Sequence, residues 1–144
     1  MTRSTVMDTT ARLVLHSALV LSLYLLVAGH NQPGGGFVAG LVAGAAVALQ
    51  YVAGGVDDVR ALSRVRPWFI LGGGLVIAVA TALAPLVTGG ALLESGEAYL
   101  TLPLVGTLHL STALAFDTGV YGVVVGVVLM VFEAFGDEPE QAAT

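Results

Sequence analysis

The chain has 144 residues, of which 56% are hydrophobic and only 10% are charged, and its mean hydropathy is +0.91. Soluble domains carry about 25% charged residues, so this chain has too little charge to cover a water-facing surface. It has no cysteine, which excludes disulfides and thiolate metal sites, and its net charge of −5 argues against nucleic-acid binding. The composition predicts one domain embedded in a membrane.

The first half of the chain predicts two membrane spans. No charged residue occurs between Leu13 and Val56. One spanning helix needs about 20 residues, so this stretch holds two spans with a break between them. The break is expected at 29–36, where polar residues, a proline and glycines coincide. We therefore expect spans over about residues 13–29 and 37–53.

The second half predicts two more spans. A hydrophilic segment ends at Pro67, a favourable first residue of a helix, and the apolar run that follows predicts a span over about 67–87. A glycine-rich connection separates it from the last apolar run. That run predicts a fourth span over about 107–132, with Asp117 as its one internal acid.

The basic residues predict the orientation of the chain. All five precede the first span or lie between the second and third, and four crossings place those regions on the same side. The positive-inside rule makes that side cytoplasmic. We therefore expect an all-α integral membrane protein with short loops and both termini in the cytoplasm: a single four-helix transmembrane domain over 1–136 and a short acidic cytoplasmic tail over 137–144. The basic residues are Arg3, Arg12, Arg60, Arg64 and Arg66.

Small residues, glycine or alanine, recur at four-residue intervals in the last three expected spans. Helices in a membrane associate through close backbone approach, which small residues permit. The stripes predict helix packing, either among the four helices of this chain or against other proteins, and the spacing alone does not choose between the two. The packing candidates are Gly40, Gly44, Gly74, Gly122 and Gly126.

Asp117 is the sharpest polar feature, because it lies about ten residues into the last expected span. An aspartate at the centre of a bilayer costs about 2.5–3.5 kcal/mol to insert, so such acids have a partner or a function. One interpretation is a carboxylate that exchanges protons or cations. The other is an interhelical hydrogen bond, or a hydrogen bond to Tyr121 one turn later.

Two histidines are further candidates. His109 is expected in the last helix, two turns before Asp117, and His30 at the outer end of the first span. Both are candidates for an ion or proton pathway with Asp117. Two histidines at matched depth also suit a bis-histidine haem, so a haem-bearing membrane anchor of a redox complex is one alternative. No phosphate loop, metal cluster or nucleophile arrangement is present in the sequence, so neither an enzyme nor a metal site is predicted.

Two motifs resemble a known family. The stretches Gly29–Phe37, with a glycine-spaced helix after it, and Phe116–Tyr121 resemble the B subunit of Mrp-type (Mnh-type) multisubunit sodium/proton antiporters of bacteria and archaea. The resemblance extends over about residues 8–135. It implies a small four-span subunit of the cytoplasmic membrane, whose complex exchanges sodium for protons and supports pH homeostasis and salt tolerance.

The resemblance also implies roles for residues and partners. Asp117 is then the intramembrane acid, contributing to ion or proton transfer. The partners are the other membrane subunits of the antiporter, the lipid bilayer, and the transported sodium ions and protons, with no cofactor. The alternative is a self-sufficient homo-oligomeric ion transporter or channel built around Asp117. The outer turn, by the same resemblance, consists of His30, Asn31, Pro33, Gly34, Gly35 and Gly36.

Overall fold

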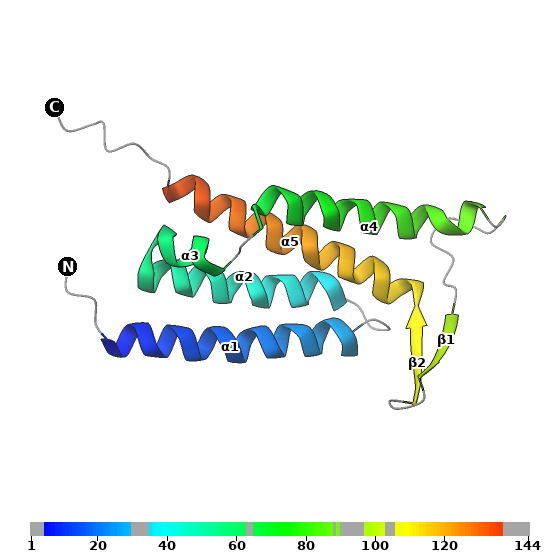
Figure 1. The fold of residues 1–144 in the computed structure, drawn as a ribbon, viewed down its shortest axis with the longest axis horizontal. Helices are drawn as coiled ribbons and strands as arrows, with labels where there is room; N and C mark the ends of the chain where they lie inside the picture. The colour runs from blue at the N-terminus through cyan, green and yellow to red at the C-terminus, as the bar shows by residue number, and fades with distance from the viewer. Residues whose placement is uncertain are drawn as a thin grey trace.

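The computed structural model describes residues 5–29, 35–62, 65–87, 89, 97–102 and 106–136. In this part of the chain, four helices are long and apolar enough to cross a membrane (Figure 1). The helical transmembrane architecture expected from the sequence is confirmed. The four helices are α1 (Thr5–Ala28), α2 (Gly35–Gly54), α4 (Pro67–Val87) and α5 (Thr112–Gly136).

The long helices lie side by side in a bundle. α1 packs on α2, α2 packs on α5, and α5 packs on α4, so α5 lies between the α1–α2 pair and α4 (Figure 1). α1 begins at the same end of the bundle at which α2 and α5 end. We call this the terminal end, and the opposite end the hairpin end.

A short helix closes the terminal end. Gly55 adopts φ +80° and its N–H donates to the Tyr51 carbonyl at 2.8 Å, which is a left-handed glycine cap on the end of α2. The chain then turns into α3 (Val56–Leu62). Val59 of α3 is fully buried and packs with Val47 of α2 and Leu129 of α5. This apolar contact fastens α3 to the bundle.

The hairpin end carries two strands that the sequence analysis does not predict. β1 (Glu97–Leu102) pairs antiparallel with β2 (Gly106–Ser111), and Tyr99 lies opposite His109 in the register (Figure 1). The expectation that the last span begins near residue 107 is therefore wrong, since α5 begins at Thr112. The physical reason is that polar residues and leucines alternate through β2, and an alternation with a period of two fits a strand.

Glycines set the spacing between α2 and α5. A Cβ atom added to Gly40 would lie 2.7 Å from Cβ of Val124, and one added to Gly44 would lie 2.9 Å from Cγ2 of Val128. Real Cβ atoms essentially never come so close. The valines of α5 therefore pack directly on the backbone of α2.

Glycines also set the spacing between α4 and α5. A Cβ atom at Gly74 would lie 2.7 Å from the Gly119 carbonyl oxygen, and one at Gly126 would lie 2.6 Å from the backbone nitrogen of Leu71. One at Gly122 would lie 3.2 Å from Cα of Gly74. Here backbone meets backbone, and the glycines of α5 face α4 of the same chain.

The close contact makes a sharp prediction for two neighbouring glycines. Gly74→Ala forces α4 and α5 apart, and we expect it to destabilise the protein by about 1–3 kcal/mol, as overpacking does. Gly73 has nothing within 4 Å of a Cβ atom, so Gly73→Ala is the matched control. It should leave stability unchanged or raise it by about 0.5–1 kcal/mol, the usual advantage of alanine in a helix. Thermal unfolding in detergent measures the stability of both variants. Equal unfolding midpoints for Gly74→Ala and Gly73→Ala would contradict the close contact.

Candidate functional site

Asp117 lies near the hairpin end of the bundle. It follows the first residue of α5, Thr112, by five positions, which is about 7.5 Å along the helix. The expectation that Asp117 lies about ten residues into the last helix is therefore wrong, because residues 106–111 form a strand and the helix starts later than predicted. Asp117 remains inside the candidate span Thr112–Phe135 and is half-buried.

The Asp117 side chain packs against the first turn of α2. A Cβ atom added to Gly35 would lie 2.5 Å from Oδ2 of Asp117, and one added to Gly36 would clash with the Asp117 backbone. The first N–H groups of a helix have no partner within the helix, and they give that end a partial positive charge. The Asp117 carboxyl therefore lies beside the backbone at the start of α2.

The two glycines belong to α2 rather than to a turn. Gly35 and Gly36 are its first two residues, and both are buried. Their expected place in the outer turn is therefore wrong. The helix of α2 includes both glycines, and because they have no side chains, α5 can pack closely against them. The other expected turn residues, His30, Asn31, Pro33 and Gly34, lie outside the described part of the chain.

The structure does not place His109 on the same helix as Asp117. His109 lies in β2, opposite Tyr99, so the expected spacing of two helical turns between His109 and Asp117 is wrong. Within the described residues, no group of three His, Cys, Asp or Glu side chains lies close enough together to hold a metal ion.

A buried hydroxyl network joins three helices one turn beyond Asp117. Ser22 of α1 is fully buried, and its Oγ lies 2.8 Å from the Ala39 carbonyl oxygen of α2 and 3.2 Å from the Tyr121 hydroxyl of α5. A serine hydroxyl has one proton and a carbonyl only accepts, so that proton goes to Ala39. The Tyr121 hydroxyl can then donate its own proton to Ser22 Oγ.

Sequence reasoning missed two buried polar residues, Ser22 and Gln50. They are 0% and 4% exposed, respectively. Each is a polar residue within an otherwise apolar span, which is the signal that marks such positions. Gln50 lines a pocket with Arg12, His16 and Asp58 at the terminal end of the bundle, away from Asp117.

Comparison with known proteins identifies the family. Residues 6–130 match the family model of domains related to the MnhB subunit of the Na+/H+ antiporter. The chain belongs to the MnhB family. The resemblance inferred from its two sequence motifs is confirmed.

Relatives of the MnhB chain cover nearly its whole length. It is 38% identical over 137 residues to the B subunit of the Na+/H+ antiporter of Bacillus subtilis (strain 168), covering 95% of this chain and 96% of that protein. It is 34% identical to a probable A/B subunit of the K+/H+ antiporter of Rhizobium meliloti (strain 1021), covering 85% of this chain but only 12% of that protein.

A solved structure shares the fold of this MnhB chain. The structure of the Mrp complex from Dietzia sp. DQ12-45-1b contains a chain that matches it with a TM-score of 0.76 and 38% sequence identity. The match covers 94% of this chain and 14% of that one. The MnhB fold therefore occurs there as part of a much longer polypeptide.

The hydroxyl network predicts coupled stabilities. Ser22→Ala and Tyr121→Phe should each destabilise the bundle by about 1 kcal/mol, the scale of interhelical hydrogen bonds in membranes. The double variant should lose less than the sum, since both changes remove the same bond. Ser17→Ala is the control, because the Ser17 hydroxyl bonds to Leu13 within α1 and is exposed. Additive losses in thermal unfolding would contradict the network.

Proposed function

We propose that this chain is an integral membrane subunit of a multisubunit cation/proton antiporter, equivalent to the B subunit of its relatives. The observation that carries the proposal is the match of nearly the whole chain, in sequence and fold, to B subunits and to a chain of an Mrp complex. The partners are then the other membrane subunits of the complex, and the transported species are a cation and protons. The location is the bacterial cytoplasmic membrane.

The terminal end of the bundle is proposed to face the cytoplasm. Arg12, Arg60 and Arg66 lie at this end, at the start of α1, in α3 and just before α4. No arginine or lysine occurs in the described residues of the hairpin end. Positive residues accumulate on the cytoplasmic side of membrane proteins, which supports this orientation. The hairpin and Asp117 then lie toward the outer surface.

Asp117 is proposed to contribute the acid of this subunit to ion or proton transfer. The N-terminus of α2 suits a negative charge there, while the low dielectric of the membrane opposes one. A carboxylate held between these opposing influences can exchange a proton for a cation that approaches it. His109 and His30 are proposed as weaker candidates for the same pathway, because only the Asp117 carboxylate can both bind a cation and exchange a proton.

Association with other membrane proteins is the first test. The tagged chain, purified from its native membrane in mild detergent, should bring several other multi-span proteins with it, identified by mass spectrometry. Deleting the chain should abolish cation-driven proton movement in inverted vesicles. Recovery of the chain alone or as a homo-oligomer would instead support a self-sufficient transporter, and full activity without the chain would refute the proposed function.

Asp117→Asn tests the role of the acid. The amide keeps the shape of the side chain but can neither carry the charge nor exchange a proton, so we expect about a tenfold loss of exchange with assembly intact. His109→Ala should have a smaller effect, because only the carboxylate can bind a cation. Proton movement should be measured with both sodium and potassium. Unchanged turnover and cation affinity in Asp117→Asn would reduce Asp117 to a packing residue.

A further inference from the structure

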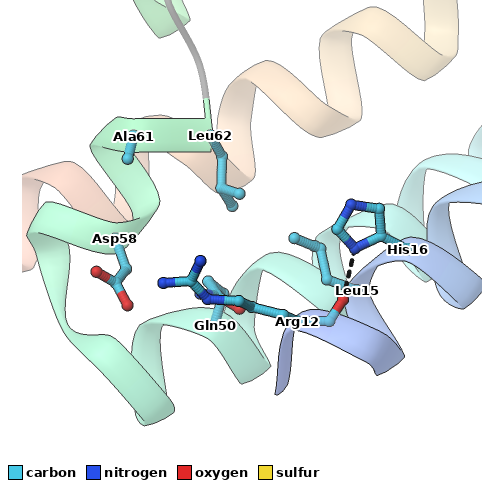
Figure 2. Close-up of a pocket in the computed structure, with 7 residues that line it drawn as sticks. All are labelled: Arg12, Leu15, His16, Gln50, Asp58, Ala61 and Leu62. Carbon is cyan, nitrogen blue, oxygen red and sulfur yellow. Dashed lines mark hydrogen bonds between the residues drawn. The ribbon is translucent and has the colours of Figure 1, made fainter. Parts of the chain in front are cut away.

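A polar pocket lies at the terminal end of the bundle, away from Asp117. It has a volume of about 230 Å³ and is formed by α1, α2 and α3 (Figure 2). Three lining residues are apolar: Leu15, Ala61 and Leu62. The other four are polar or charged: Arg12, His16, Gln50 and Asp58. Gln50 is the buried member of this polar set, while Arg12 and His16 are exposed at the edge of the pocket.

Gln50 is the group that needs a ligand. Its side chain is 4% exposed, and its Oε1 is buried without a hydrogen-bond partner in the structure. A buried acceptor left without a donor is costly, so such atoms normally bond to protein or to ordered water. Figure 2 shows the Gln50 side chain in the pocket, with the Arg12 guanidinium extending between it and Asp58.

His16 faces the same pocket with one ring nitrogen unused by the helix. Its Nδ1 lies 2.6 Å from the Arg12 carbonyl oxygen, which only accepts, so Nδ1 carries a proton. In the neutral ring, Nε2 is then an acceptor, and it is the atom that takes up a proton. The charged groups that line the pocket with His16 are Arg12 of its own helix and Asp58 of α3, while α2 contributes the neutral Gln50.

We propose that this pocket is a water-filled port in which His16 exchanges protons with the adjoining aqueous phase. Water fits the chemistry, because it donates to Gln50 and to His16 Nε2 and accepts from Arg12. Arg12 and Asp58 bring opposite charges to the lining, so the pocket offers neither a cation nor an anion surroundings of a single sign. The volume has room for several waters, each of which takes about 30 Å³ in the liquid. The hydration stands independently of the proposed antiport function, whereas the proton-exchange role rests on it.

Cysteine labelling tests the water. The chain has no cysteine of its own, so a single introduced thiol reports alone. In the assembled complex, in open membrane fragments, Leu15→Cys should react with a charged methanethiosulfonate at least about tenfold faster than Leu26→Cys, because thiols react as thiolates in water. The control is matched: Leu15 and Leu26 are 4% and 7% exposed on α1, and Leu26 lies closer to a helix end.

The labelling outcome decides the first half of the proposal. The extent of labelling is measured from the increase in mass of this chain, so the result does not depend on transport activity. Equal rates, or faster labelling of Leu26→Cys, would overturn the water-filled port. If Leu15→Cys fails to assemble, Gln50→Cys reports on the same pocket against the same control.

The proton role has its own test. His16→Asn can still donate to the Arg12 carbonyl but lacks Nε2, so proton movement in inverted vesicles should fall several-fold with assembly unchanged. Ser17→Ala, on the neighbouring exposed residue, should leave the rate as it is. Fast labelling of the pocket together with an unaltered rate in His16→Asn would overturn proton exchange at His16. If the complex with the unaltered chain shows no cation/proton exchange at all, the proposed function is refuted instead.

Discussion

The backbones of α4 and α5 touch at Gly74 and Gly119, and this close approach joins α4 to the rest of the bundle. Lipid tails are as apolar as leucine, so burial against lipid gives helices little reason to associate, and close packing has to supply it. Because α5 also receives α2 along Gly40 and Gly44, it is held on two sides. Its position in turn determines where Asp117 meets the rest of the chain.

The buried polar groups described here are each accommodated by a different kind of contact. Asp117 relies on two glycines that let its side chain reach the start of α2. The Ser22 and Tyr121 hydroxyls satisfy one another and a carbonyl. Gln50 has a pocket in place of a protein partner for Oε1. A member of a transport complex can thus carry polar groups at two levels of the bundle while presenting mostly apolar side chains outward.

The sequence predicted the spans well because the length of an apolar run is a property of the chain alone, and lipid allows few other structures there. It placed the start of the last span wrongly, because the alternation of polar residues and leucines over 106–111 is a strand pattern that was included in the helix. It singled out Asp117 from its chemistry. It did not foresee the contact of Asp117 with Gly35 or of Ser22 with Tyr121, because these partners are far apart in the chain and meet only through the packing of α5.

The central place of α5 has a consequence for the order in which the protein is made. α1 and α2 are consecutive and pack on each other, so they can associate as soon as both have entered the membrane. α4 has its main contact with a helix that the ribosome has not yet produced. Until α5 arrives, Gly40 and Gly74 lack the residues that pack on them, and Ser22 lacks its tyrosine. The last of the long helices to be synthesised, α5, therefore joins the α1–α2 pair to α4. If synthesis stops before α5, the α1–α2 pair and α4 remain in the membrane without the helix that connects them.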